Sequence, residues 1–251
     1  MSKKTLVLIL NHNTANLSSN LFNSLYPFED DIYETFVLDN GSDEDELNVL
    51  SSLLINKQRI IKTNSNLLFG GGLNYAFEII QNNSEKFDSL LFLNSDLIIH
   101  PYNFVKALKH YLEIEELDII SPCVLQPSVN QNFWKQMHCW NSPNIRKVKW
   151  VDLQAPMFSR EFITHKAIVP EKLKYGWGLD LLYGMLTDKI GIADFIPVIH
   201  LDSQTVKRCC HEPIISDYWV NAEINMREFF KVYNYNKFLE LREYGKQYGQ
   251  K

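Results

Sequence analysis

The feature that most constrains the fold is a repeated pattern in which an apolar run stops at polar residues and a helix-like segment follows. Residues 5–10 form the first run, and Leu17, Leu21 and Leu25 then recur at helical spacing. Further apolar runs cover residues 35–38, 59–62 and 89–93. Four strands that alternate with helices predict an α/β fold with a mostly parallel, twisted central sheet flanked by helices.

Polar residues follow three of these predicted strands. They are Asn11-His12-Asn13, Asp39-Asn40-Gly41-Ser42 and Asn94-Ser95-Asp96. Because parallel strands end at one edge of a sheet, and ligands of open α/β sheets bind at that carboxyl edge, we expect a binding site there.

Two of the predicted helices begin differently. Ser42 and Asp45 form a capping-box pattern, and acids at 43–46 would repel phosphate, so this helix start should face an uncharged part of a ligand. Gly70-Gly71-Gly72 opens a helix that has Leu73, Phe77 and Ile80 on one face and no acid in its first turn. An anion can rest on the amides of such a start, and a bare flexible turn is the alternative interpretation.

The second half of the chain is less regular. We predict a helix from Pro101 to Leu112, strands at 118–124, 150–158 and 193–199, a helix at 178–190 and a helical tail at 218–248, whereas residues 126–144 resist assignment. The expected organisation is one domain over 1–215, with a nucleotide-binding half at 1–100 and an acceptor and catalytic half at 101–215. A C-terminal helical extension covers 216–251.

Composition excludes some classes of function. The 251 residues are 45% hydrophobic and 22% charged, which is typical of a compact globular protein, and the net charge of -5 argues against nucleic acid as a partner. The apolar run after Lys3 and Lys4 stops at Asn11, so a buried first strand is favoured over a signal peptide. The four cysteines form no C-x-x-C pair, which favours a reducing cytosol.

Two sets of residues are candidates for metal binding. Asp96 either caps the next helix or holds a divalent cation, and His200, at the end of a later strand, would shift the preference from Mg²⁺ toward Mn²⁺. Cys209-Cys210-His211 is the second set. Neighbouring residues of an extended chain point to opposite faces, so packing is the better interpretation for it.

Four segments together carry a family resemblance. Residues 6–13 (LVLILNHN), 36–42 (FVLDNGS), 66–74 (NLLFGGGLN) and 91–96 (LFLNSD) resemble, in order and spacing, the motifs of family 2-type glycosyltransferases with the GT-A fold. The Asn-first form of the D-x-D motif is similar to that of a rhamnosyltransferase-like subgroup. The resemblance implies that nucleotide and donor are bound by Asn11, Asn13, Asp39, Asn40, Gly70, Gly71, Asn74, Asn94 and Ser95. It also implies that Asp96 holds a divalent cation, Mn²⁺ or Mg²⁺, on the diphosphate.

The resemblance is thinner beyond residue 100. Residues 150–160 (WVDLQAPMFSR) resemble the family's strand that faces donor and acceptor, and residues 175–191 fall where the family has Glu-Asp before a helix. Asp180 matches the catalytic base, and a helix N-cap is its alternative role. Leu179, Leu182 and Leu186 replace the family's polar residues. Trp177 either stacks on an acceptor sugar or belongs to the core.

The resemblance implies an inverting, metal-assisted transfer of a sugar from a nucleotide-diphosphate donor to a hydroxyl of a glycan or lipid-linked acceptor. A UDP- or dTDP-linked donor is expected, because Asp39 can accept a hydrogen bond from the imide N–H of a pyrimidine. The resemblance further implies polysaccharide biosynthesis in the cytoplasm, with peripheral contact at the inner face of a membrane as an extension. The aromatics and lysines of the tail fit either that contact or a docked, solvated helix.

Two other functions compete with this one. The first is a degenerate GT-A domain that binds a nucleotide-sugar or a partner protein without turnover. The second is a sugar-phosphate nucleotidyltransferase, which would need a glycine-rich basic loop after the first strand. Asn11-His12-Asn13-Thr14 is no such loop.

Overall fold

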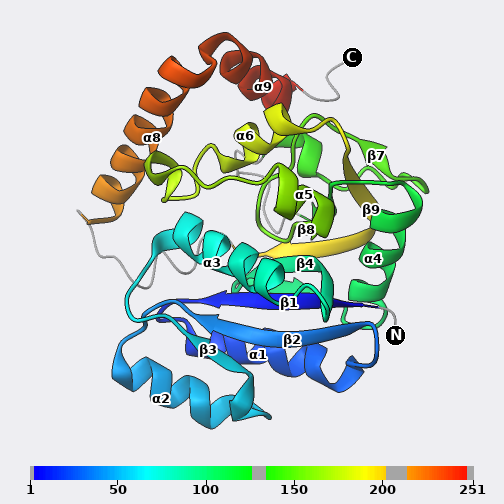
Figure 1. The fold of residues 1–251 in the computed structure, drawn as a ribbon, viewed down its shortest axis with the longest axis vertical. Coiled ribbons are helices and arrows are strands. Elements are labelled where there is room, and N and C mark those ends of the chain that lie inside the picture. The colour runs from blue at the N-terminus through cyan, green and yellow to red at the C-terminus, as the bar shows by residue number, and fades with distance from the viewer. Residues whose placement is uncertain (1–2, 126–133, 202–213, 248–251) are drawn as a thin grey trace.

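The computed structural model describes residues 3–125, 134–201 and 214–247. Within them a nine-stranded sheet runs in the order β3-β2-β1-β4-β8-β6-β9-β5, and β7 pairs with β9 (Figure 1). The strands are β1 (Lys4–Asn11), β2 (Tyr33–Asp39), β3 (Ile60–Lys62), β4 (Phe87–Asn94), β5 (Leu97–Ile99), β6 (Ile119–Leu125), β7 (Arg146–Lys147), β8 (Met157–Ser159) and β9 (Ile190–His200).

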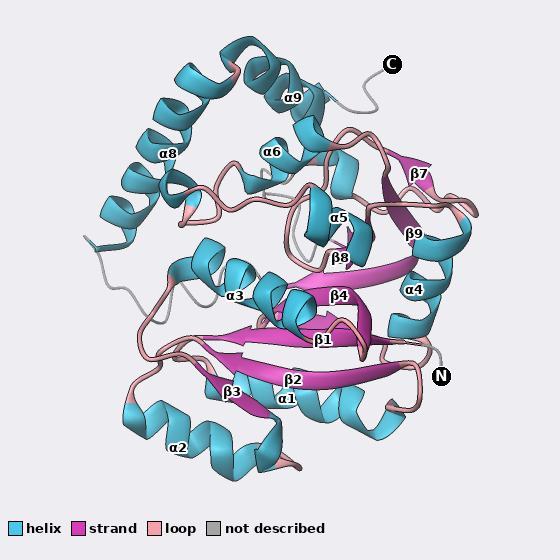
Figure 2. Ribbon diagram, viewed as in Figure 1, coloured by secondary structure: helices cyan, strands magenta, loops and turns pink. Residues whose placement is uncertain are grey.

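Helices flank this sheet, as Figure 2 shows. They are α1 (Ala15–Leu25), α2 (Glu44–Leu53), α3 (Leu68–Asn82), α4 (Phe104–Ile114), α5 (Arg160–His165), α6 (Leu179–Leu186), α8 (Ile214–Tyr233) and α9 (Tyr235–Gln247), with short 3-10 turns η1 (Tyr26–Phe28), η2 (Lys57–Arg59), η3 (Lys135–Met137) and η4 (Glu171–Leu173). The predicted α/β fold with a mostly parallel central sheet is confirmed.

The register of the central strands brings three polar strand ends to one level. Strand β1 lies between β2 and β4 and is parallel to both, with Asn11 opposite Asp39 and Leu10 opposite Asn94. Its apolar residues are buried on both faces, which is why the strand reads as a continuous apolar run. The side chains at these three ends therefore share the carboxyl edge of the sheet.

The strand predicted at 150–158 is mostly absent, because β8 begins only at Met157. Pro156 has no N–H to donate, so a regular ladder cannot continue through it. The preceding segment still follows β4, since the carbonyl oxygens of Gln154 and Pro156 accept hydrogen bonds from the amides of Asn94 (2.9 Å) and Phe92 (3.0 Å). This segment thus runs beside the end of β4 without being a strand.

The end of β9 lies beside the turn that follows β4. The sequence did not reveal β5, which pairs antiparallel with β9 and places Leu97 opposite His200. The amide of Leu201 donates to the carbonyl oxygen of Asp96 at 2.9 Å. Asp96 therefore precedes a strand, and the next helix, α4, has Asn103 as its N-cap, so the helix-cap interpretation of Asp96 is wrong.

Helix α6 is shorter than the predicted helix at 178–190. It ends at Leu186, with Thr187 as an extended C-cap residue. The Thr187 hydroxyl donates to the buried carboxylate of Asp118 and accepts from the amide of Lys189, which fixes a turn before β9 begins at Ile190.

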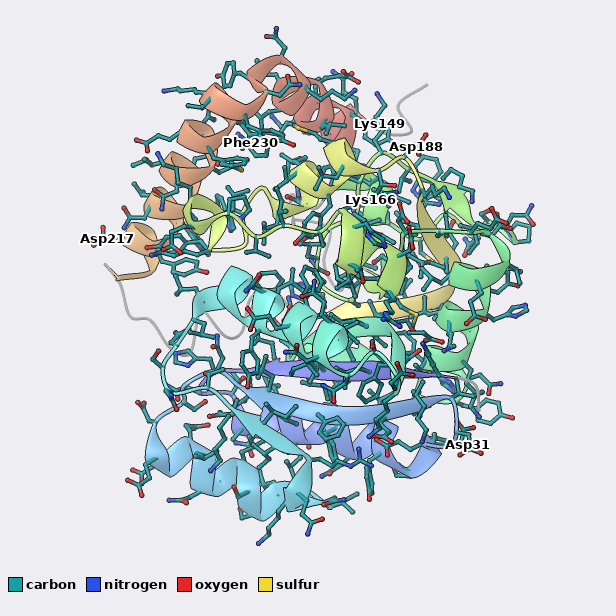
Figure 3. All side chains as sticks on the ribbon, viewed as in Figure 1. Asp31, Lys149, Lys166, Asp188, Asp217 and Phe230 are labelled. Carbon is teal, nitrogen blue, oxygen red and sulfur yellow. The ribbon has the colours of Figure 1, made fainter. Side chains whose placement is uncertain are left out.

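The predicted tail forms α8 and α9, which pack on elements of the second half of the chain. Helix α8 contacts η4, and α9 contacts α6 and η3. The buried Trp150 indole donates to the carbonyl oxygen of Leu241 at 2.9 Å. Phe230 of α8 lies against Gly178, the residue before α6 (Figure 3). The boundary at 215/216 stays a prediction.

None of the helices in the described ranges combines the length and apolar character needed to span a membrane. Cys123 and Cys139 are free thiols. Cys209, Cys210 and His211 lie outside the described residues, as does part of the unassigned stretch at 126–144.

Candidate active site

Asn11 is the centre of a buried hydrogen-bond network at the carboxyl edge. Its Nδ2 donates to Asp39 Oδ1 at 2.7 Å and to Ser42 Oγ at 3.0 Å. Its Oδ1 accepts from Thr14 Oγ1 at 3.2 Å and from Ser18 Oγ at 2.7 Å. Both N–H groups and both oxygen lone pairs of this amide are therefore used, so the network fixes the orientation of the Asp39 carboxylate.

The predicted capping box at Ser42 and Asp45 is wrong. Asp43 is the N-cap of α2, and Ser42 Oγ instead accepts from the amide of Asn13 at 3.0 Å as well as from Asn11. Glu46, in the first turn of α2, accepts from the amide of Ala15 at 3.1 Å. The acids of this turn therefore join α2 to the start of α1.

Asn40 ties the glycine-rich helix to the same edge. Its Oδ1 accepts from the amide of Leu67 at 3.0 Å, and its Nδ2 donates to the carbonyl oxygen of Leu68 at 3.1 Å. Leu68 has a φ of 60°, a conformation that leucine rarely adopts, and its amide donates to Asn66 Oδ1 at 2.8 Å. Strain of this kind is often found at functional sites.

The glycine triplet lies inside α3, which begins at Leu68. The amide of Gly70 donates to the carbonyl oxygen of Lys174 at 2.7 Å, so it is not available to an anion in this conformation. A Cβ at position 70 would lie 2.9 Å from the carbonyl oxygen of Leu173. This glycine thus permits close backbone approach, and the interpretation as a bare flexible turn is wrong.

Asp96 and His200 form a second cluster at the edge. His200 Nε2 lies 3.2 Å from Asp96 Oδ1, and both side chains are almost fully buried. The neighbouring Ser95 Oγ is 3.0 Å from Thr14 Oγ1, which links this turn to the Asn11 network. A carboxylate and an imidazole suit Mn²⁺. Within the described ranges no three His, Cys, Asp or Glu side chains converge on one point, so substrate oxygens or water would complete the coordination.

Asp180 lies in the first turn of α6, and Gly178 with a φ of 87° occupies the N-cap position. The N-cap interpretation of Asp180 is therefore wrong. Burial raises the pKa of Asp180 to about 7, the nearby Asp152 carboxylate adds to this rise, and backbone amides of α6 and the Arg242 guanidinium oppose it. A carboxylate with a pKa near neutrality is suited to accept a proton in a reaction.

Asp152 is a site residue that sequence reasoning missed. Burial raises its pKa, while the His200 imidazole and the amide of Gln154 act in the opposite direction. Gln154 Nε2 donates to Asp152 Oδ2 at 3.0 Å. A signal was present in the sequence, because Asp152 interrupts the apolar run Trp150-Val151-Asp152-Leu153 much as Asp96 interrupts its own run.

The tail supplies a charge near this carboxylate pair. Arg242 of α9 donates to Glu223 of α8 at 2.9 Å and lies over the Phe238 ring at 5.5 Å. The guanidinium is therefore held in place while it acts on Asp180 from outside the sheet. Trp177 is 40% exposed, which makes the core interpretation wrong and leaves its ring accessible.

The structure thus brings together most of the residues implied by the resemblance. Asn11, Asn13, Asp39, Asn40, Ser95, Asp96 and His200 lie along the edge, and Asn94 ends β4 beside them. Asn74 stands apart from this group. It is exposed on α3 and donates to Glu78 at 2.8 Å, one turn further along the same helix. The ligands of all these residues stay predictions.

Solved structures of similar fold include glycosyltransferases. The chain matches M. tuberculosis glucosyl-3-phosphoglycerate synthase in complex with Mn²⁺, UDP and glucosyl-3-phosphoglycerate with a TM-score of 0.59 and 16% identity, covering 92% of this chain and 80% of that one. It matches residues 1–349 of S. aureus TarS with a TM-score of 0.58 and 14% identity, covering 90% of this chain and 72% of that fragment. Identities this low show the fold alone.

Sequence comparison identifies the family. A search of curated proteins gives no significant match. The family model described as glycosyl transferase family 2 matches residues 6–167, which is more than half of the chain. The matched range includes the Asn11 network, Asp96 and Asp152. The chain therefore belongs to glycosyl transferase family 2.

Proposed function

We propose that this protein is a metal-dependent inverting glycosyltransferase that moves a sugar from a UDP- or dTDP-linked donor to an acceptor hydroxyl. One arrangement carries the proposal. The buried Asp96–His200 pair lies at the carboxyl edge, 3.2 Å apart, and Asp152 links it electrostatically to Asp180. A site for a leaving diphosphate and a proton acceptor are thus close to each other.

The donor nucleotide is assigned to the Asn11 network. The Asp39 carboxylate, oriented by Asn11, can accept a hydrogen bond from the imide N–H of uracil or thymine. The acids at the start of α2 disfavour phosphate near them, so the diphosphate would extend toward Asp96. The similar synthase structures bound to UDP with Mn²⁺ or Mg²⁺ support this choice of donor and cation.

Asp96 and His200 would hold the cation, which when bound supplies positive charge that stabilises the departing diphosphate. The chain's own residues do the rest. Asp180 accepts the proton of the acceptor hydroxyl as that oxygen attacks the anomeric carbon from the side opposite the diphosphate. The bond from the anomeric carbon to the diphosphate breaks in the same step, so the configuration inverts. The exposed ring of Trp177 offers a flat apolar surface for an acceptor sugar.

Leucines replace three polar residues of the family pattern, which is the reason to consider a degenerate domain that binds without turnover. Leu179 and Leu182 are fully buried in the core, and Leu186 is partly buried against it. These leucines therefore stabilise the position of α6, which carries Asp180. A glycan or lipid-linked acceptor, a role in polysaccharide biosynthesis, a cytoplasmic location and membrane contact through the tail stay predictions.

Thermal unfolding with a panel of nucleotides and nucleotide-sugars, with and without Mn²⁺, tests the proposal. A ligand at about a hundredfold excess over its Kd stabilises the native state by about 2.7 kcal/mol. We expect an Mn²⁺-dependent rise in Tm with a uridine or thymidine diphosphate, and we expect Asp96→Ala to abolish it.

Asp31→Ala is the matched control. Asp31 is exposed and precedes β2 at the opposite end of the sheet, as Figure 3 shows. This variant should respond to the nucleotides as the wild type does. No rise in Tm with any nucleotide would contradict the proposed function, and a rise without Mn²⁺-dependent donor hydrolysis would favour the degenerate domain.

A further inference from the structure

Asp152 interacts with both ends of the candidate site. Its carboxylate acts on His200, the partner of Asp96, and on Asp180. Under the proposed function the Asp96–His200 pair marks the leaving diphosphate, and Asp180 marks the attacking hydroxyl. The transferred sugar lies between the leaving diphosphate and the attacking hydroxyl, since its anomeric carbon exchanges one for the other.

Geometry places Asp152 between these two points, the diphosphate and the hydroxyl. Gln154, hydrogen-bonded to Asp152 at 3.0 Å, accepts through its carbonyl oxygen from the amide of Asn94, two residues before Asp96. On the other side, the residues just before Asp152, Lys149 and Trp150, pack against Gly184 of α6, the helix that carries Asp180. Asp152 therefore lies beside the expected position of the sugar.

Gln154 holds this carboxylate in one orientation. Because a carboxylate can only accept, the amide nitrogen of Gln154 must face it, and the 3.0 Å bond to Oδ2 fixes which way the amide points. The backbone of Gln154 is itself fixed to the end of β4 through the amide of Asn94. Gln154 thus joins Asp152 to the turn that carries Asp96.

The oxygen of the Gln154 side-chain amide lowers the stability of the folded protein. Gln154 is 6% exposed, and its Oε1 has no hydrogen-bond partner among the described residues. A buried acceptor without a partner destabilises the native state. Stability alone therefore does not account for a glutamine here, whereas holding Asp152 in position does.

We propose that Asp152 determines sugar specificity by accepting hydrogen bonds from hydroxyl groups of the transferred sugar, and that Gln154 is its positioning residue. This inference rests on the proposed function and deepens it. With Oδ2 bonded to Gln154, the carboxylate still has lone pairs on Oδ1 for a hydroxyl. The Asp152 carboxylate repels the carboxylate of a uronic acid, so the site selects neutral sugars over uronic acids.

Equilibrium binding separates the sugar contact from the diphosphate contact. The probes are UDP, UDP-glucose, UDP-galactose, UDP-N-acetylglucosamine and UDP-glucuronic acid, with dTDP and dTDP-rhamnose, all measured by calorimetry with Mn²⁺. The quantity compared is the Kd of the free diphosphate divided by the Kd of each conjugate. A higher ratio means a more favourable sugar contact.

We expect Asp152→Asn to lower this ratio about tenfold for the best neutral sugar, because a hydrogen bond to a charged group is lost. It should raise the ratio for UDP-glucuronic acid and leave the Kd of UDP within about twofold, which a merely structural role would not do. Gln154→Met, which keeps the volume, should lower the neutral-sugar ratio about threefold. It also serves as a second variant if Asp152→Asn fails to fold.

Asp188→Asn is the matched control, because it makes the same Asp-to-Asn change away from the site. Asp188 is exposed in the turn between α6 and β9, as Figure 3 shows, and every ratio should stay at the wild-type value. Ratios unchanged in both site variants would overturn the inference and leave the proposed function standing. An equal loss for UDP and its conjugates would also overturn it, since Asp152 would then act on the diphosphate. No diphosphate binding to the wild type would refute the proposed function and the inference with it.

Discussion

The two halves of the site treat their buried polar groups in opposite ways. At the donor edge Asn11, Asp39 and Ser42 bond to one another over 2.7 to 3.0 Å. On the side of the proposed base, Asp152 and Asp180 are like charges, and burial raises the pKa of each. The first arrangement stabilises the fold and fixes the orientation of the Asp39 carboxylate. The second arrangement destabilises the folded protein when both carboxylates are ionised, and it raises the tendency of Asp180 to accept a proton.

The largest expected effect is on the rate of sugar transfer, and it tests whether Asp180 is the proton acceptor. Asp180→Asn keeps the shape of the side chain but cannot accept the proton, so transfer or donor hydrolysis should fall by about 10²- to 10⁴-fold. The Kd of the donor should stay close to the wild-type value, because the donor edge is intact. Initial rates and calorimetry on the same preparation measure both. Undiminished turnover would exclude Asp180 as the base.

Stability of the donor edge gives the next largest effect. Asn11→Ala removes a fully buried amide and leaves the groups it bonded without that partner, so the free energy of unfolding should fall by about 1–3 kcal/mol. Chemical denaturation measures this change.

Asn20→Ala is the control for that measurement, because Asn20 is exposed on α1 and alanine favours helix. Its free energy of unfolding should not decrease. Equal losses in the two variants would show that the Asn11 network contributes nothing specific.

The smallest expected effect is the change in the free energy of unfolding per pH unit. Here substitution of Asp180 should stabilise the protein at high pH, whereas Asn11→Ala destabilises it. The pKa of Asp180 is raised from 3.8 to about 7, so the folded chain keeps a proton that the unfolded chain has already released. The stabilising contribution is therefore complete below about pH 4 and is lost as pH rises through about 7, with a slope of at most about 1.4 kcal/mol per pH unit.

Asp180→Asn has no such proton to lose. Relative to the wild type its free energy of unfolding should rise across that interval and then level off. Urea denaturation on both sides of the interval measures the difference, with Asp152 and Arg242 unchanged in both proteins. A difference that does not vary with pH would contradict the raised pKa of Asp180.

The sequence predicted the donor edge better than the catalytic side, for a physical reason. Asn11 and Asp39 end regular buried strands, so periodicity alone places them at one edge. Asp152 and Gln154 lie in an irregular segment with a turn at Leu153 and Gln154, before β8 begins at Met157, and no periodicity marks them. Their partners His200 and Asp180 are distant in sequence, so only the fold reveals the grouping.

Local errors had a related origin. Ser42 looked like a helix cap because Ser-x-x-Asp is a local signal, but its hydroxyl is used by Asn11 and Asn13 from another segment. The glycine triplet is locally compatible with a bare flexible turn, whereas it lies inside α3 and Gly70 meets the backbone of Leu173 and Lys174. In each case a long-range partner replaced the local one.

The bond between the Gly70 amide and the Lys174 carbonyl oxygen, at 2.7 Å, joins the helix beside the donor edge to the loop that leads into Asp180. If that loop moves away from α3, this amide becomes free to exchange its hydrogen with solvent. The exchange rate of one backbone hydrogen would then report how often the two halves of the site separate, even before any substrate is known.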